Sequence, residues 1–402
     1  MFLSGSQFLF GSKEAASNGR FPVQNDANIL TCGELFSGCG GMAAGLTQAG
    51  LRHEWMIEFN AIACQTLRDN WHAPWRSQPL TIMETDVRSV DWSSIGTVDI
   101  VAGGPPCQPF SKGGRAGGEN DPRDMWPEAI RAVKHLRPRG FLFENVKGLL
   151  RPAFSEYLQR ILDSLRRAGA TEPDSPDVYE VIVVSVNAVD YGAAQKRERV
   201  LIAGVRRDCG KLEPFPERTH SVERLVWEKW VSGQYWQRHH LAHPVCGPTS
   251  RIEKAALRKV ERRGVEPQER PWMTCRDVFV GLGEPAVGSG VSGHQLRAGA
   301  KAYPGHEGSP IDEPAKALKA GAHGVPGGEN MLVDCSGAVR YFTVREAARL
   351  QGMPDAFVPA GSWSQAMRQL GNAVPAQLAE VAGRWIRQCA RGQEDNEGKV
   401  RK

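Results

Sequence analysis

The chain has 402 residues, of which 41% are hydrophobic and 24% are charged. This length and composition are typical of a globular protein with a large core, and they exclude a disordered chain or a small fold that depends on disulfides. No run approaches roughly eighteen apolar residues, which excludes a transmembrane helix. The net charge of +5 permits a polyanionic partner without requiring one.

The cysteines and the two ends of the chain indicate where the protein resides. Nine cysteines are scattered along the sequence, an odd count that indicates free thiols and a reducing compartment. The stretch Met1–Gln7 lacks a basic segment and is broken by Gly and Ser, so no secretory signal is expected. Residues 1–27 are expected to form a loosely ordered lead-in, and residues 391–402 a charged tail.

Short apolar runs alternate with helical patterns between residues 28 and 207. Strands are predicted at residues 28–36, 55–58, 98–102, 140–143, 179–186 and 199–205, and helices at 42–46, 61–71, 127–136 and 154–168. This alternation predicts an α/β fold with a mostly parallel sheet flanked by helices. In such open sheets ligands bind beyond the carboxyl ends of the strands, which is where the unusual residues of this sequence lie.

The pattern changes after residue 207. Residues 208–334 are rich in Gly, Pro, His, Trp and Arg, and they are predicted to form a second, smaller and loop-rich domain. Within this region Arg251–Arg263 predicts either a phosphate-contacting surface, with Arg258 and Arg262 as contacts, or a solvated basic helix face. Helical patterns return at 342–351 and 365–385, so 28–207 and 335–390 are assigned to one domain.

Three histidines and a cysteine lie close together in the second region, namely His239, His240, His243 and Cys246. Zinc sites commonly contain paired Cys-x-x-Cys spacings, and this sequence has none there. No metal site is therefore predicted.

A glycine-rich turn, Gly38–Gly41, lies between the first predicted strand and the helix after it. Glycines at such a place allow a tight bend and a close approach of backbone to a ligand at the positive end of a helix. Glu58, about 20 residues further along, could accept both hydroxyls of a ribose. Asp86 could accept a hydrogen bond from an exocyclic amine. The pattern favours a nucleotide-like cofactor, and a solvated loop acid is the alternative for either carboxylate.

The strongest local signal is Gly103-Gly104-Pro105-Pro106-Cys107-Gln108-Pro109-Phe110-Ser111, at the end of a predicted strand. Two prolines fix the main chain before Cys107, which gives a nucleophile a preset angle and a low ordering cost. A buried structural thiol is the alternative, although it would not need this brace. Residues 112–123 are glycine-rich and are expected to form a mobile lid or a surface loop.

Two further charged sites stand at strand ends. Glu144 follows an apolar run, where desolvation raises the pKa of a carboxyl and lets it share a proton near neutrality. The alternative for Glu144 is an ordinary strand-end acid. The cluster Gln195–Arg199 precedes another run, and an arginine there can bind a carboxylate or a phosphate through two hydrogen bonds. A solvated charge cluster is the alternative.

Six short motifs occur in a fixed order along the sequence, and their combination is specific. They are Glu34-Leu35-Phe36-Ser37-Gly38-Cys39-Gly40-Gly41, Pro105-Pro106-Cys107-Gln108-Pro109-Phe110-Ser111, Phe143-Glu144-Asn145-Val146, Gln195-Lys196-Arg197-Glu198-Arg199, Arg345-Glu346-Ala347-Ala348-Arg349-Leu350-Gln351 and Gly371-Asn372-Ala373-Val374-Pro375. Together they resemble the DNA (cytosine-5)-methyltransferase family. The resemblance covers about residues 28–207 and 335–390, and residues 208–334 fall where this family keeps its variable target-recognition domain.

The resemblance implies a Rossmann-like class I methyltransferase domain that binds S-adenosyl-L-methionine. Cys107 would be the nucleophile, Glu144 would contact the cytosine ring nitrogen and exocyclic amine, and Arg197 would assist at the base. The implied cofactor contacts are Phe36, Ser37, Gly38, Cys39, Gly40, Gly41, Glu58, Asp86, Val87, Pro106, Asn372, Ala373 and Val374. The implied DNA contacts are Ser111, Arg123, Gln195, Arg199, Arg258 and Arg262, with Gln195 and Arg199 also expected to support the packing of the active-site loop.

The implied substrate is a cytosine flipped out of a specific double-stranded DNA sequence. The implied setting is a restriction-modification system in the bacterial cytoplasm, at the nucleoid, with a cognate restriction endonuclease and no membrane. Two alternatives stay open, a tRNA cytosine-5 methyltransferase and a non-catalytic DNA-binding regulator. The long region 208–334 favours duplex DNA over tRNA, and the intact Cys107, Glu144 and Arg197 favour an active enzyme.

Overall fold

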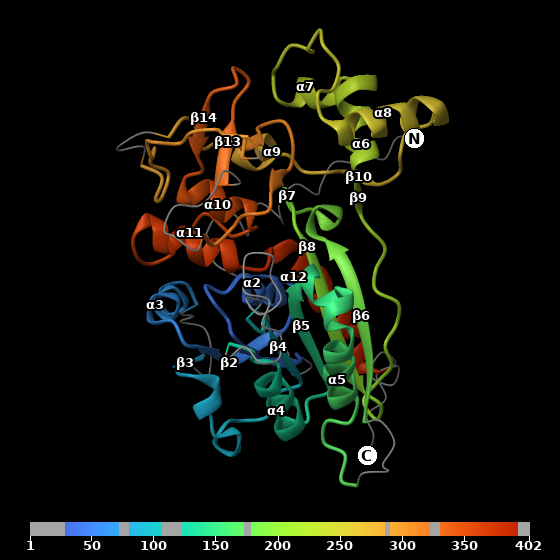
Figure 1. The fold of residues 1–402 in the computed structure, drawn as a ribbon, viewed down its shortest axis with the longest axis vertical. Helices are drawn as coiled ribbons and strands as arrows, with labels where there is room; N and C mark the ends of the chain where they lie inside the picture. Colours follow the sequence, from blue (N-terminus) through green and yellow to red (C-terminus); the bar gives the residue numbers. More distant parts are fainter. Residues whose placement is uncertain are drawn as a thin grey trace, which may run out of the picture.

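The computed structural model describes residues 29–71, 80–106, 123–172, 178–285, 290–304, 306–321 and 330–392. In this part of the chain a seven-stranded sheet has the strand order β3-β2-β1-β4-β5-β8-β6. Helices cover the sheet on both faces, and the described parts of residues 220–341 lie above it (Figure 1). The predicted lead-in and most of the predicted tail lie outside the described residues.

Five parallel strands form most of the sheet. They are β1 (Thr31–Leu35), β2 (Arg52–Glu58), β3 (Thr81–Glu84), β4 (Ile100–Gly103) and β5 (Gly140–Val146). Next to β5, β8 (Glu198–Arg206) runs antiparallel and pairs in turn with β6 (Tyr179–Asn187). The predicted α/β fold with a mostly parallel sheet is therefore confirmed. The edge strand β3 was not among the predicted strands because it is short and only partly buried.

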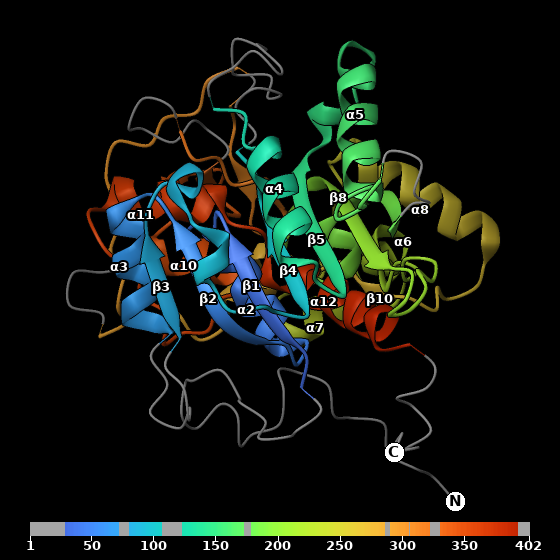
Figure 2. The same ribbon diagram turned by 90° about the horizontal axis from the view of Figure 1, so that it is seen from below.

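The two faces of the sheet bury different cores. On one face lie α4 (Trp126–Leu136) and α5 (Ser155–Arg166), and on the other α2 (Gly41–Gln48) and α12 (Ala376–Arg391) (Figure 2). Successive side chains of β5 point to opposite faces of the sheet, so Phe141 and Phe143 pack in the first core and Leu142 packs in the second. A third cluster joins α2 to α3 (Ala61–Asn70), α10 (Val344–Leu350) and α11 (Trp363–Asn372).

Short elements make up the region after β8. The helices are α6 (Val222–Val226), the π-helical turn η8 (Trp227–Val231), α7 (Gln234–Arg238), α8 (Arg251–Arg263) and α9 (Cys275–Phe279). The strands are β9 (His220–Ser221), β10 (Arg270–Pro271), β11 (Ser309–Pro310), β12 (Ala315–Lys316), β13 (Met331–Val333) and β14 (Val339–Tyr341). Strand pairing ties this region to the rest of the chain, since β12 pairs with β7 (Gln195–Lys196), and β13 pairs with β14 across the predicted boundary at residue 334.

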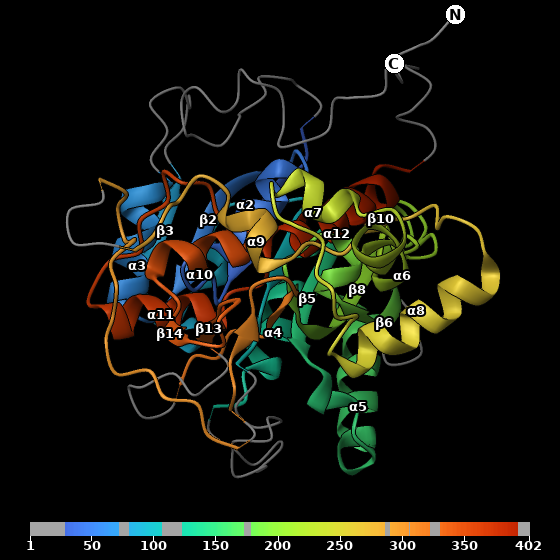
Figure 3. The same cartoon turned by 90° about the horizontal axis from the view of Figure 1, so that it is seen from above.

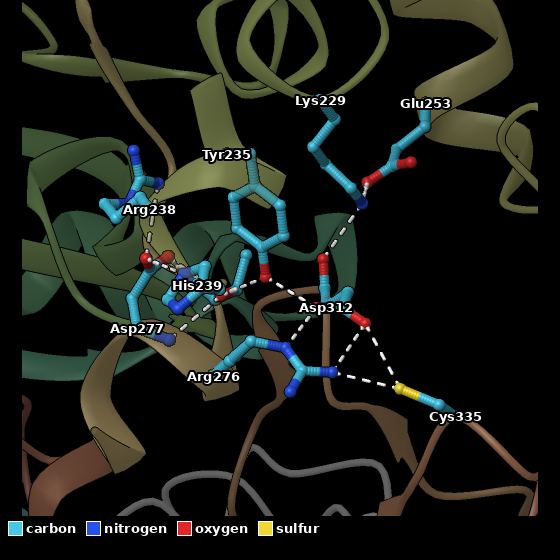
Figure 4. Close-up of polar contacts among 10 residues, drawn as sticks. Lys229, Tyr235, Arg238, His239, Glu253, Arg276, Asp277, Asp312 and Cys335 are labelled. Atoms are coloured by element: carbon cyan, nitrogen blue, oxygen red, sulfur yellow. Dashed lines mark hydrogen bonds and ion pairs between the residues drawn. The ribbon is translucent and has the colours of Figure 1, made fainter. Parts of the chain in front are cut away.

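A buried polar cluster fastens η8 and α8 to the segment around Asp312, shortly before β12 (Figure 4). The Nζ atom of Lys229 lies 2.6 Å from Oε1 of Glu253 and donates to the carbonyl oxygen of Asp312 at 3.0 Å. Arg276 pairs with the Asp312 carboxylate at 2.6 Å. The side chains of Lys229 and Glu253 are 3% and 5% exposed. Because water reaches neither charge, the ion pair between them must compensate for the cost of burying both.

Candidate active site

The glycine-rich turn follows β1 directly and bends through left-handed backbone conformations. Phe36, Gly38 and Gly40 have φ angles of 55°, 55° and 86°. Such a φ is strained for a phenylalanine, and strain of this kind persists where the surrounding structure enforces it. A Cβ atom on Gly38 would meet no heavy atom within 4 Å. The tip of the turn therefore faces open space.

Glu58, at the end of β2, is hydrogen-bonded to this turn. Its Oε2 accepts the N–H of Gly38 at 2.8 Å, and its Oε1 accepts the N–H groups of Phe59 and Asn60 at 3.0 and 2.8 Å. A carboxylate has about four lone-pair sites, so Glu58 can still accept a ligand hydroxyl. The structure thus brings together the turn and the carboxylate that the sequence spacing pairs.

The Asn372–Val374 segment closes the turn from the other side. A Cβ atom on Gly41 would lie 2.5 Å from the carbonyl oxygen of Val374 and 2.9 Å from Cβ of Ala373, so this close approach requires glycine. Asn372 is exposed, whereas Ala373 and Val374 are buried. The Asn372–Val374 segment therefore packs directly against the first turn of α2, beside the glycine-rich turn.

Two side chains of the turn point into the protein. The Ser37 hydroxyl donates to the carbonyl oxygen of Glu34 at 3.1 Å. Cys39 is buried among apolar residues, and burial raises the pKa of its thiol to about 12. Ser37 and Cys39 can therefore meet a ligand through their main chain, and the Cys39 thiol is unsuited to act as a nucleophile.

Asp86 and Val87 lie just beyond β3. Arg88 pairs with the Asp86 carboxylate at 2.5 Å and also donates its backbone N–H to it at 2.9 Å, an ion pair that the sequence analysis did not anticipate. These hydrogen bonds lower the pKa of Asp86 and keep it an acceptor at neutral pH. Val87 is buried.

Phe59 is a residue that the sequence analysis missed. It follows Glu58 directly, and 75% of its surface is exposed. A large aromatic ring left in water beside a ligand-type carboxylate offers a face on which a planar group can stack. Its position next to a strand-end acid was the available signal.

The second half of the site lies at the ends of β4 and β5. The Asn145 amide donates to the carbonyl oxygen of Pro105 at 3.1 Å, which fixes the chain after β4 against β5. A Cβ atom on Gly104 would lie 3.5 Å from Oε2 of Glu144. Glu144 therefore borders the segment that leads through the half-buried Pro106 into Cys107. Cys107 and Ser111 themselves lie outside the described residues, so their placement stays a prediction.

Arg199 forms an ion pair with Glu144. Their side chains are only 13% and 11% exposed. Residue Val146 of β5 stands opposite Arg199 of β8, so Glu144 and Arg199 are diagonal neighbours on one face of the sheet. Arg199 was expected to contact DNA and to support the packing of the active-site loop; in the structure it lies beside Glu144.

Arg197, which was expected to assist at the base, has other partners. Its guanidinium is buried and donates to the carbonyl oxygens of Leu318 and Gly371, both at 2.7 Å. The chain switches at Arg197 from β7, in one sheet, to β8, in another, so residues two apart do not share a face here. The structure therefore places Arg199, and not Arg197, in contact with Glu144, and the expected role of Arg197 at the base stays a prediction.

The remaining predicted DNA contacts divide into buried and exposed residues. Gln195 is fully buried, and its amide donates to the carbonyl oxygen of Leu350 at 2.8 Å and to the Gln351 side chain at 3.0 Å. Gln195 thus lies inside the protein, where it can support packing, and its expected DNA contact stays a prediction. Arg123, Arg258 and Arg262 are exposed.

The cluster of histidines does not assemble into a metal site. Nε2 of His239 lies 2.8 Å from Oδ1 of Asp277 (Figure 4), whereas Nδ1 of His243 lies 2.9 Å from the carbonyl oxygen of Pro244. Within the described ranges, no three His, Cys, Asp or Glu side chains form a group that could hold a metal ion. Among the helices of those ranges, none is both long and apolar enough to span a membrane.

Comparisons with known proteins agree with this geometry. A family model described as C-5 cytosine-specific DNA methylase matches residues 30–388. The type II methyltransferase M.NgoMIV of Neisseria gonorrhoeae is 30% identical over 88% of this chain and 96% of its own length. The type II methyltransferase M.Eco47II of Escherichia coli is 32% identical over 95% of this chain and 83% of its own.

Solved structures show the same fold. A DNA modification methyltransferase encoded within an Escherichia coli prophage superposes with a TM-score of 0.60 at 20% identity, covering 90% of this chain and 99% of its own. A DNMT2 mutant from Spodoptera frugiperda gives a TM-score of 0.55 at 15% identity, with coverages of 89% and 99%. The family model spans nearly all the motifs from the turn to α12, and this chain therefore belongs to the C-5 cytosine-specific DNA methylase family and is a DNA (cytosine-5)-methyltransferase.

Proposed function

We propose that the protein transfers a methyl group from S-adenosyl-L-methionine to carbon 5 of cytosine in a specific double-stranded DNA sequence, through a covalent adduct of Cys107 with a flipped-out base. One observation carries this proposal. The Glu144–Arg199 pair borders the segment that leads from β4 to Cys107. The last residue of β4, Gly103, pairs with Leu35 of β1, which comes just before the glycine-rich turn. Groups suited to the base and groups suited to the cofactor therefore share one sheet edge.

The residues around the turn fit S-adenosyl-L-methionine. Open space beyond Gly38 admits a ligand, the remaining acceptor site of the Glu58 carboxylate suits a ribose hydroxyl, and the exposed ring of Phe59 suits the adenine. Asp86 and the Asn372–Val374 segment would border the same ligand. When bound, the cofactor supplies the methyl group that carbon 5 receives.

The protein side chains prepare the base for this transfer. Addition of the Cys107 thiolate to carbon 6 breaks the aromatic conjugation and places enamine-like electron density on carbon 5. Glu144 shares a proton with the ring nitrogen and so limits the charge that builds up on the ring, while Arg199 holds the Glu144 carboxyl in place. The hydrogen of the methylated carbon 5 then leaves as a proton to solvent, its electron pair restores the double bond between carbons 5 and 6, and the bond from carbon 6 to sulfur breaks to release the Cys107 thiolate.

The region 208–334 would serve as a target-recognition domain, and residues 28–207 with 335–390 as the catalytic domain. Flipping a cytosine out of the duplex costs a few kcal/mol, which contacts to the DNA must offset. Exposed Arg258 and Arg262 on α8 are available to phosphates, and Arg123 is also exposed. Double-stranded DNA is thus the proposed partner. Because the relatives above are type II methyltransferases, we also propose a role in a restriction-modification system with a cognate endonuclease.

Expression in a host that lacks cytosine methylation, followed by bisulfite sequencing of the genome, tests this function. We expect one short motif to be protected throughout, and no protection with Cys107→Ser, because a serine hydroxyl ionises far less than a thiol. The exposed Cys246 offers a matched control, and Cys246→Ser should leave protection unchanged. Full activity of Cys107→Ser would rule out the covalent mechanism, and methylation of tRNA but not of DNA would overturn the proposed substrate.

A further inference from the structure

One exposed arginine beyond the catalytic site lies over an aromatic ring. Arg297 lies in the segment 290–304, and its guanidinium carbon is 4.4 Å from the centre of the Trp363 ring. Trp363 packs in turn against Tyr341, with 5.6 Å between ring centres. Among the residues that the structure describes, no carboxylate pairs with Arg297 and no hydrogen bond occupies its guanidinium.

Stacking on the indole has a specific consequence for the guanidinium. The ring restrains the plane of the guanidinium but leaves the N–H groups along its edge free to donate. A guanidinium restrained in this way loses less conformational freedom when it binds than a solvated arginine does. Arg297 is therefore suited to donate two parallel hydrogen bonds to one acceptor group. A contact through charge alone, such as one with a phosphate, would not require the guanidinium to be restrained.

His294 pins the segment to the body of the protein. Its side chain is fully buried, with Nδ1 3.0 Å from the hydroxyl of Thr343 and Nε2 3.1 Å from the carbonyl oxygen of Gly283. The backbone N–H of Arg345 donates to the carbonyl oxygen of Gly293 at 3.0 Å. Directly after this anchor the chain becomes exposed at residues 295–297. A loop fixed at its base and exposed beyond it is suited to contact a large ligand.

The composition of the segment fits nucleic acid. Residues 290–306 contain no Asp or Glu, and Arg297 and Lys301 are separated by Ala298, Gly299 and Ala300. Without carboxylates the segment does not repel phosphates, and its small side chains allow the backbone to approach a groove closely.

The Arg297–Trp363 pair lies on the side of the molecule where the strands end. A Cβ atom on Gly361, just before α11, would lie 3.0 Å from Cγ2 of Ile62 in the first turn of α3. Since α3 follows Glu58 at the end of β2, the start of α11 with Trp363 is on that side. Figures 2 and 3 both show the orange segment 290–304 running past α11 toward this face.

We infer that Arg297 reads a guanine of the recognised sequence by donating to its N7 and O6 atoms in the major groove, and that Trp363 is a positioning residue for it. The inference rests on the proposed function, since it assumes that duplex DNA is the substrate. Two parallel donors on an arginine match guanine, and this pairing is the commonest specific contact between proteins and DNA.

Methylation rates on oligonucleotides that carry 7-deazaguanine at one guanine of the site at a time test the inference, because this base lacks the N7 acceptor. For the wild type we expect kcat/KM to fall about 10- to 100-fold at one position. Arg297→Ala and Arg297→Lys should be slower on the natural site and insensitive to the change at that position. Trp363→Leu should weaken the discrimination at that guanine alone.

Lys301→Ala is the matched control in the same segment, and it should keep the full sensitivity to 7-deazaguanine. Discrimination by Arg297→Lys equal to that of the wild type would mean a phosphate contact and would overturn the inference, as would an unchanged site preference in Arg297→Ala. Absence of any DNA methylation by the wild type would count instead against the proposed function.

Discussion

Alanine substitution of two arginines only two residues apart should affect different properties of the protein, activity in one case and stability in the other. Arg199 pairs with Glu144 at the site, whereas Arg197 donates to the carbonyl oxygens of Leu318 and Gly371 inside the protein. Arg199→Ala should therefore impair methyl transfer with little change in stability. Arg197→Ala should mainly lower the free energy of unfolding.

The structure sets the size of both effects. A hydrogen bond to a charged group contributes about 1.5–3 kcal/mol, so Arg199→Ala should lower kcat/KM by about 10- to 150-fold if the pair acts in the transition state. Arg197→Ala removes two such bonds at a position only 3% exposed and leaves two carbonyl oxygens unpartnered. We expect it to lower the free energy of unfolding by about 3–5 kcal/mol.

Initial rates with a radiolabelled methyl donor and urea unfolding followed by circular dichroism measure the two quantities. Arg207→Ala serves as the control, because Arg207 is exposed just after β8 and should change neither. A stable but inactive Arg197→Ala, together with a fully active Arg199→Ala, would refute this assignment of roles.

Two further predictions concern stability. Lys229→Met should lower the free energy of unfolding by about 3–5 kcal/mol, since it leaves the Glu253 carboxylate buried without its cationic partner, and the double variant with Glu253→Leu should recover most of the loss in urea unfolding; a double variant as unstable as the single one would contradict this. Burial lowers the pKa of His220 from 6.5 to about 4, so the unfolded state binds its proton first as the pH falls and stability declines between these values. Between pH 7 and about pH 5 the wild type should lose about 2 kcal/mol more than His220→Gln, and equal losses would argue against it.

Local signals in the sequence predicted most of the sheet and the pairing of the glycine-rich turn with Glu58. The runs predicted as strands at 140–143 and 199–205 lie within β5 and β8, because a strand covered on both faces needs apolar side chains in both directions. The glycine-rich turn and Glu58 meet because neighbouring parallel strands end at one edge. Such features depend on residues close in sequence or on the general geometry of a parallel sheet.

The roles of individual side chains depended on contacts between distant segments. The order of residues in Gln195–Arg199 does not reveal that the chain changes sheets at Arg197, and this change directs Arg199 to Glu144 and Arg197 to Gly371. In the same way, Arg297 acquires its orientation from Trp363, far along the chain. The sequence alone therefore determined the fold and the family, through periodicity and motif order, whereas the tertiary structure decided which charged group meets which partner, because burial and pairing exist only once remote segments pack together.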